Sequence, residues 1–249
     1  MKPNILFIVI DSLRADKCYG DKKTSVTPNI DSLIKNGTYF SQTITHGQGT
    51  ISCMSSILTG LYPFESMTQN EDIFVINPAA ETYIENLEGF GYHTHATVQE
   101  SLSHMGLSQV FKNNFEMYPV TLKTWTGLGQ QVIDKIKENK QKEPWFYYLH
   151  LFDLLWISPN AHFNPNDGPD EISNDKFGIN QYERIFSVMD IWFGRILHNL
   201  DLKNTLIVLT ADHGADLGIY TPTMEQEHKN FQKLKAYDIG VNFRIIQNI

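Results

Sequence analysis

Uninterrupted apolar runs alternate along the chain with segments of helical periodicity. Three runs rich in aliphatic and aromatic residues lack the apolar-polar alternation of a half-buried strand, and they span residues 4–10, 145–151 and 205–211. Such runs are typical of strands that are covered on both faces, as in a mostly parallel sheet. Further strands are predicted over 39–45, 94–98 and 241–246.

The segments between these runs predict helices. Pro28 lies in the first turn of one helix, which Asn36 and Gly37 end. Other helices are predicted over 51–58, 80–87, 125–139 and 179–200, and a surface loop is expected over 159–175, which is rich in Asn, Asp and Pro. Strands that alternate with helices predict one α/β domain over residues 1–249, a three-layer sandwich with a largely parallel central sheet.

Charge and cysteine content narrow the function class. The formal charge of −8 and the pI of about 5.5 argue against a nucleic-acid-binding protein, which would present a basic face. Two cysteines without C-x-x-C spacing favour a reducing, cytoplasmic location. The apolar run at the N-terminus is too short for a membrane span and lacks a signal-peptide cleavage region. The oligomeric state is left open.

Acidic residues directly follow two of the predicted strands. Asp11 follows the first strand, and Asp212, His213 and Gly214 follow the run 205–211. Two carboxylates and an imidazole would form a divalent cation site, and the hydroxyl of Thr50 at a helix N-terminus could complete it. Taken singly, each residue is more often a helix cap or turn former, so spacing alone does not join them.

Four sequence blocks occur in a characteristic order, at residues 2–16, 27–31 with Leu33, 57–63 and 210–218. Together they resemble the sulfatase family of the alkaline phosphatase superfamily, from the first strand nearly to the end of the chain. The resemblance implies the α/β fold of that family. It also links Asp11, Thr50, Asp212 and His213 as parts of one metal-dependent site.

The resemblance also assigns the nucleophile. In this family it lies ten residues before the glycine of a Leu-Thr-Gly element, which is Gly60 here, so the position is Thr50. Sulfatases carry Cys or Ser there, oxidised to formylglycine within a Cys-x-Pro-x-Arg sequence, and Cys53 lacks that context. Because threonine cannot become formylglycine, the resemblance implies phosphoester chemistry through a phosphothreonine intermediate.

Several positions depart from the family pattern. Ser12 stands where many members have a second acid. The family's Asp-Pro-His element begins at Asp153 but continues with two leucines, and His150 before it is interpreted as a core residue and a weak substitute. His228 is expected to contact the substrate or leaving group, with a plain loop histidine as the alternative. His46 is a weaker candidate for substrate contact.

The sequence therefore predicts a metal-dependent hydrolase of phosphate mono- or diesters, or of sulfate esters, that uses a covalent threonine intermediate. The expected cofactor is one divalent cation, with zinc or manganese suited to an imidazole and magnesium or calcium to oxygen ligands. The expected substrate is a small-molecule, glycan or lipid ester. One alternative is a phosphoethanolamine or glycerol-phosphate transferase. The other is a catalytically silent metal-binding homologue, favoured by the missing family residues and by the expected lack of the usual C-terminal subdomain.

Overall fold

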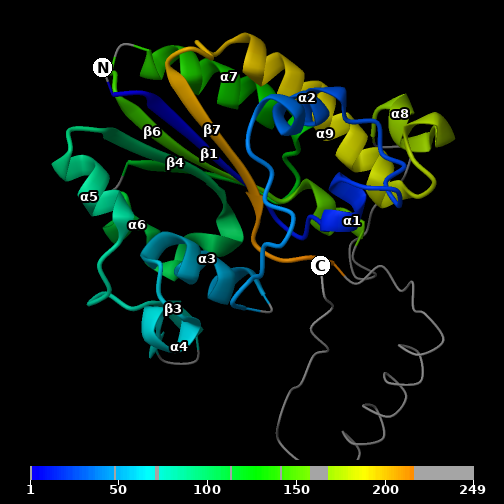
Figure 1. Cartoon of the computed structure of the whole chain (residues 1–249). Helices are drawn as coiled ribbons and strands as arrows, with labels where there is room; N and C mark the ends of the chain where they lie inside the picture. Colours follow the sequence, from blue (N-terminus) through cyan, green and yellow to red (C-terminus); the bar gives the residue numbers. More distant parts are fainter. Residues whose placement is uncertain are drawn as a thin grey trace, which may run out of the picture.

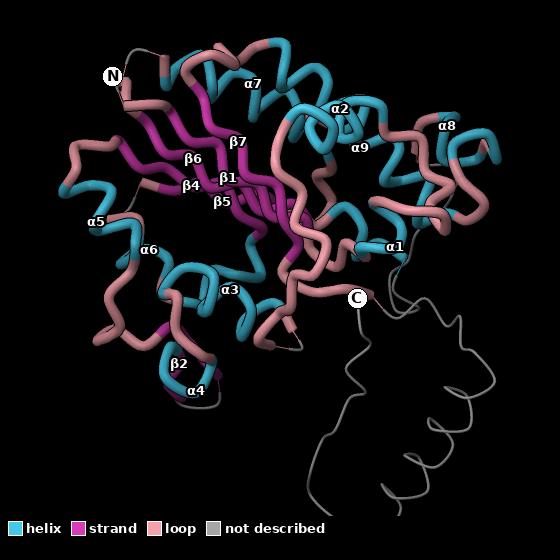
Figure 2. Tube along the Cα trace, in the orientation of Figure 1, coloured by secondary structure: helices cyan, strands magenta, loops and turns pink. Residues whose placement is uncertain are grey.

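A twisted sheet of five parallel strands forms the centre of the computed structural model (Figures 1 and 2). The structure describes residues 2–215 apart from 48, 71–72, 113, 141 and 158–167. The strand order is β5-β4-β6-β1-β7, so the first strand lies between two strands that follow much later in the chain. The strands are β1 (Asn4–Ile10), β4 (His93–Gln99), β5 (Phe115–Tyr118), β6 (Trp145–Leu151) and β7 (Thr205–Ala211).

Nine α-helices are described, and they cover both faces of the sheet. Figure 1 shows α2, α7 and α9 on one face and α3, α5 and α6 on the other. The helices are α1 (Ala15–Cys18), α2 (Pro28–Asn36), α3 (Thr50–Thr59), α4 (Pro63–Ser66), α5 (Tyr83–Gly89), α6 (Leu107–Val110), α7 (Leu128–Asn139), α8 (Asp170–Ser173) and α9 (Gln181–His198). Within the described part of the chain, no helix combines the length and apolarity needed to cross a bilayer.

Successive residues of the central strands enter two separate cores. In β1, Leu6, Ile8 and Ile10 pack in the core under α7 and α9, whereas Phe7 and Val9 pack in the core on the side of α3. Both faces of the strand are therefore apolar, because side chains alternate between two buried surfaces. This arrangement confirms the predicted α/β sandwich with a parallel sheet.

A buried carboxylate on α9 fixes the start of α2. Asp190 Oδ1 accepts a hydrogen bond from the N–H of Ile30 at 2.8 Å, and its Oδ2 accepts from the backbone and side chain of Asn29 at 3.1 and 2.8 Å. These bonds satisfy N–H groups that have no partner inside the helix. A side chain far along the chain thus acts as the cap.

Several predicted elements need correction. Residues 39–45 form a loop, and no strand is present there. Sequence reasoning missed β5 and the hairpin of β2 (Met67–Asn70) and β3 (Ile73–Ile76). The helices predicted from 80 and 125 begin three residues later, and α8 lies within the predicted loop 159–175. The strand predicted over 241–246 lies outside the described residues.

Candidate active site

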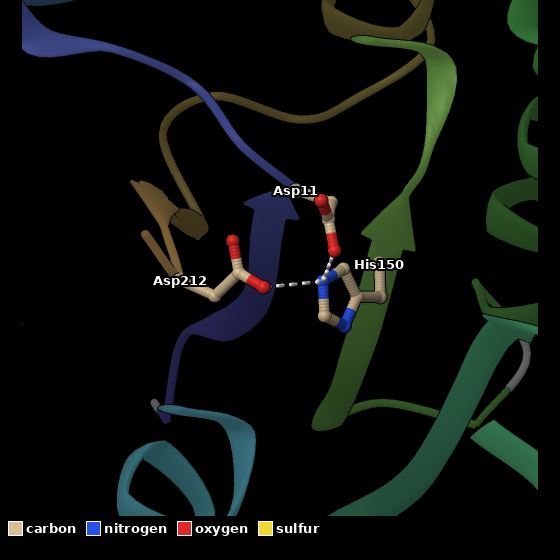
Figure 3. Close-up of side chains that lie close together, drawn as sticks. All are labelled: Asp11, His150 and Asp212. Atoms are coloured by element: carbon tan, nitrogen blue, oxygen red, sulfur yellow. Dashed lines mark ion pairs between the residues drawn. The ribbon is translucent and has the colours of Figure 1, made fainter. Parts of the chain in front are cut away.

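The residues of the candidate site lie at the carboxyl ends of three neighbouring strands. β1 lies between β6 and β7, with Ile10 paired to Leu151 on one side and to Ala211 on the other. Asp11 and Asp212 follow directly after β1 and β7, and both are buried. The strand register therefore brings together two carboxylates from opposite ends of the sequence (Figure 3).

Ser12 orients both carboxylates. Its backbone has φ 63°, in the left-handed region that residues other than glycine seldom adopt. Its N–H donates to Asp212 Oδ1 at 3.1 Å, and its hydroxyl donates to Asp11 Oδ1 at 2.6 Å. Each Oδ1 atom is thereby occupied, and the two Oδ2 atoms face the other groups of the site.

Thr50 begins α3 beside these carboxylates. Its hydroxyl donates to Asp11 Oδ2 at 2.8 Å and lies 3.3 Å from His213 Nε2. The N-cap residue is Gly49, whose extended backbone leads into the helix. The first N–H groups of a helix lack partners within it and carry partial positive charge. A hydroxyl, a carboxylate and an end of a helix that attracts anions therefore meet at one place.

His213 lies against both Asp212 and Thr50. Its backbone N–H donates to Asp212 Oδ1 at 2.8 Å, and its ring Nε2 lies 3.5 Å from Asp212 Oδ2. Its Nδ1 lies 2.8 Å from the carbonyl oxygen of Gly214, which can only accept a hydrogen bond. The proton therefore belongs on Nδ1, and the lone pair of Nε2 points to the site. The fold thus brings together all four residues that the sequence joined in one cluster.

The surroundings of Asp11 and Asp212 shift their pKa values in opposite directions. Burial, reinforced by the negative charge of Asp212, raises the pKa of Asp11. Burial also opposes ionisation of Asp212, but the imidazoles of His150 and His213 outweigh it and lower the pKa of Asp212. Two buried carboxylates this close ionise together more readily beside a positive charge, and a divalent cation supplies such a charge.

His150 belongs to the cluster, and sequence reasoning placed it in the core instead. It is the penultimate residue of β6 and is fully buried. Its Nε2 lies 3.7 Å from Asp212 Oδ2 and 4.0 Å from Asp11 Oδ2 (Figure 3). One ligand atom from each of these three residues lies within 4.8 Å of the others, so together they could hold a cation. The available signal was an imidazole one residue before the end of a strand that points to the site.

Of the two histidines predicted to contact the substrate, one is exposed and the other lies outside the described residues. His46 is exposed, and its ring packs edge-on against Tyr62 at 4.8 Å. His228 lies outside the described residues. Asp153 is buried, and its Oδ1 accepts two hydrogen bonds of 2.8 Å from the N–H and hydroxyl of Thr124. Burial raises the pKa of Asp153, and these contacts tie it to the neighbouring loop.

Two curated proteins are similar to this chain in sequence. An uncharacterised protein of Haemophilus influenzae is 23% identical over 236 residues, which cover 92% of this chain and 34% of that protein. An N-acetylgalactosamine-6-O-sulfatase of Bacteroides thetaiotaomicron is 31% identical over 99 residues, covering 37% of this chain and 19% of the sulfatase. The chain therefore spans about a third or less of the length of these relatives.

Solved structures share the fold at low sequence identity. Ps i-CgsB, solved with a neocarrahexaose, has a TM-score of 0.66 at 22% identity, covering 88% of this chain and 60% of that one. The phosphonate monoester hydrolase of Agrobacterium radiobacter has a TM-score of 0.59 at 17% identity, with coverage of 86% and 63%. The periplasmic domain of EcEptC from Escherichia coli, solved with zinc, has a TM-score of 0.57 at 17% identity, with coverage of 90% and 67%.

The match to a whole family is more extensive than the match to any of these proteins. The family model described as Sulfatase covers residues 3–243, which include both strand ends of the site and Thr50. Together with the fold shared with alkaline phosphatase and sulfatase structures, this match shows that the chain belongs to the sulfatase family.

Proposed function

We propose that this chain is a metal-dependent hydrolase of phosphate mono- or diesters with Thr50 as its nucleophile. The carrying observation is the hydrogen bond from the Thr50 hydroxyl to Asp11 Oδ2, within a cluster that includes Asp212 and His213. Sulfate esters are the second substrate class, because threonine cannot be converted into the formylglycine of the usual sulfatase reaction.

The donor set fits a divalent cation. Asp212 Oδ2 is buried and has no hydrogen-bond partner among the described residues. Asp11 Oδ2 and His213 Nε2 lie on either side of the Thr50 hydroxyl. Two carboxylates with an imidazole suit zinc or manganese better than calcium or magnesium. When bound there, the cation would lower the pKa of the Thr50 hydroxyl and offset negative charge on the ester.

The residues around Thr50 would carry out the two steps. In the first, the Thr50 hydroxyl gives up its proton, and Thr50 Oγ1 forms a bond to phosphorus while the bond to the ester oxygen breaks. That ester oxygen takes up a proton and leaves as the alcohol. Asp11 Oδ2 already accepts the hydrogen bond of the Thr50 hydroxyl, so it is placed to accept the proton that this hydroxyl loses. The amide groups that begin α3 would hold the anionic oxygens. In the second step, a water oxygen forms a bond to phosphorus and the bond to Thr50 Oγ1 breaks. The phosphate product leaves, and a proton from the water restores the Thr50 hydroxyl.

Comparison with relatives suggests which esters to test first. One relative is named as a sulfatase of N-acetylgalactosamine, and one solved neighbour holds a neocarrahexaose. Another neighbour is a phosphonate monoester hydrolase. We therefore infer that a phosphorylated or sulfated sugar is the first substrate to assay, followed by lipid and small-molecule esters.

The test compares Thr50→Ala and Thr50→Ser with the wild type on nitrophenyl phosphate, the corresponding diester and nitrophenyl sulfate. Zinc, manganese, magnesium and calcium are each supplied. Thr50→Ala should lose turnover by roughly 10³-fold or more, and Thr50→Ser should keep it within about tenfold. Thr59→Ala is the matched control, since Thr59 lies at the other end of α3 and donates to Ser55.

Trapping identifies the intermediate and the acceptor. Acid quenching during turnover should leave one phosphoryl group on Thr50, detected by peptide mass mapping. Faster transfer to an added alcohol than to water would instead favour the phosphoryl transferase. If the wild type neither binds a cation nor turns over any of the three esters, the silent homologue is favoured and the proposal is wrong.

A further inference from the structure

His150 presents a buried nitrogen without a hydrogen-bond partner to the two carboxylates. Within the described residues, neither His150 Nε2 nor Asp212 Oδ2 has a hydrogen-bond partner, and both residues are buried. A polar atom without a partner in a protein interior is destabilising, because it has lost its hydrogen bonds to water without a replacement. Two such atoms that face each other across a small gap point to a shared partner between them (Figure 3).

The spacing of these atoms suits a shared cation better than a hydrogen bond. Nε2 lies 3.7 Å from Asp212 Oδ2 and 4.0 Å from Asp11 Oδ2, whereas N–H···O bonds measure about 2.7–3.2 Å. Ligand bonds of about 2.0–2.2 Å to one zinc ion place tetrahedral ligand atoms roughly 3.5 Å apart. His150 Nε2 is therefore about as far from each carboxylate oxygen as two ligands of one ion are from each other.

The rest of the imidazole is held in place. Its Nδ1 lies 3.4 Å from the hydroxyl of Tyr148, and the ring of Phe152 packs against it with centroids 4.9 Å apart. Histidines that bind metals commonly donate from their second nitrogen to a fixed partner, which orients the ring. When the proton of His150 is on Nδ1, facing the Tyr148 hydroxyl, the lone pair of Nε2 points at the carboxylates.

Ser12, in place of a second acid, leaves a ligand position near the carboxylates that His150 Nε2 can fill. A second acid at position 12 would add another oxygen ligand, but Ser12 instead donates to the Oδ1 atoms of Asp11 and Asp212. Each carboxylate can then offer a single oxygen, Oδ2, on the side of His150. One protein ligand is lost at position 12, and the buried imidazole lies where a replacement can act.

We propose that His150 Nε2 is a direct ligand of the catalytic cation, an inference that rests on the metal dependence proposed above. The site then contains two imidazoles, from His150 and His213, together with the carboxylates of Asp11 and Asp212. Magnesium and calcium prefer oxygen ligands, whereas zinc and cobalt accept imidazole readily. His150 therefore sets the preference of the site for zinc and cobalt.

X-ray absorption of the zinc-loaded wild-type chain and of His150→Gln tests this proposal without an activity assay. The extended fine structure reports the number of imidazoles bound to zinc. Two are expected in the wild type, because His150 and His213 both bind. An imidazole count that is the same in His150→Gln as in the wild type overturns the proposal, whatever the activity of the protein.

Metal affinity of His150→Gln gives a second test. Competition with a coloured chelator should show zinc and cobalt binding weakened by about 100-fold, and magnesium binding changed by less than about threefold. Equal weakening for all three cations would mean that His150 only positions the carboxylates, and would overturn the proposal. His95→Gln is the control, because His95 is also a buried histidine of this sheet, and its Nε2 has no hydrogen-bond partner among the described residues and lies 3.9 Å from Glu116 Oε2. This substitution should leave every affinity unchanged.

Failure of this inference can be separated from failure of the proposed function. If the wild type binds zinc and hydrolyses the ester but shows as many imidazoles on the metal as His150→Gln does, only the assignment of His150 is wrong. If the wild type binds none of the cations, both proposals fall. Circular dichroism melting of the His150→Gln protein establishes that the altered affinity belongs to a folded chain.

Discussion

Asp11 and Asp212 are expected to affect folding in opposite directions when no metal is bound. Both are buried, with ligand atoms within 4.8 Å of each other. The pKa of Asp11 is raised by burial and by the charge of Asp212, so its ionised form opposes folding. The pKa of Asp212 is lowered despite its burial, so its ionised form supports folding. Replacing each carboxylate by an amide of the same shape separates the two effects.

Asp11→Asn should stabilise the metal-free protein by about 1–2 kcal/mol. Two unit charges about 4 Å apart repel by about 4 kcal/mol at an effective dielectric constant near 20. The substitution removes this repulsion but weakens the hydrogen bonds from Ser12 and Thr50, each by about 1 kcal/mol, because their acceptor is no longer charged. The difference corresponds to a melting temperature higher by about 2–8 °C for a chain of this size.

Asp212→Asn should destabilise the metal-free protein by about 2 kcal/mol. Asp212 Oδ1 accepts from the N–H groups of Ser12 and His213 at 3.1 and 2.8 Å. Loss of the negative charge relieves the repulsion from Asp11, but this gain is offset by the lost attraction to the imidazoles of His150 and His213, which lowers the pKa of Asp212. Each of the two hydrogen bonds also weakens by about 1 kcal/mol. The melting temperature should fall by about 4–8 °C.

The assay is thermal unfolding in a chelator, from about pH 5 to pH 8. Since the folded-state pKa of Asp11 lies above its ordinary value of 3.8, wild-type stability falls as the pH rises through that folded pKa. The advantage of Asp11→Asn should therefore grow with pH. The lowered pKa of Asp212 lies below this range, so its effect should stay constant. A lower melting temperature for Asp11→Asn than for the wild type at pH 8 would refute the reasoning, as would equal shifts for both variants.

Three further substitutions test the packing around the site. Asp190→Ala should cost about 3 kcal/mol in urea unfolding, because it leaves buried N–H groups of α2 unpaired, and zinc affinity should not change. Gly129→Ala should cost about 1–3 kcal/mol, since its Cβ would lie 2.3 Å from the ring of Trp192, and a neutral result in the same assay would contradict this packing. Ser12→Gly should relieve about 1 kcal/mol of left-handed strain yet weaken zinc binding by roughly tenfold, because Asp11 loses its hydroxyl donor, and chelator competition measures this.

Much of the fold was predictable because the central strands are apolar on both faces. The runs 4–10, 145–151 and 205–211 match β1, β6 and β7 residue for residue. Short strands at the margin carry a weaker signal. The pattern of β5 is only four residues long and half exposed, whereas the apolar residues of 39–45 point to a strand that does not form.

The candidate site was predictable where a local motif marks it and not where the fold alone creates it. Asp212 and His213 follow a strand in a recognisable motif, and Thr50 was reached by counting from Gly60. His150 lies in no local sequence motif that points to the site. Its position beside Asp11 follows from the placement of β6 next to β1, and strand order is not written in the apolar pattern of either strand.

The geometry of the site depends on the register of β1, and apolar side chains far from the chemistry set that register. A slip of one residue would move Asp11 by about 3.3 Å and turn its side chain to the opposite face of the sheet. Because both faces of β1 are apolar, polarity alone does not oppose such a slip. The shapes of the packed side chains oppose it instead, since Phe7 stacks on Tyr148 with ring centroids 5.8 Å apart and also packs against Phe146 with centroids 6.3 Å apart. The same aromatic contacts hold β6 against β1, so they fix the distance from His150 to Asp11.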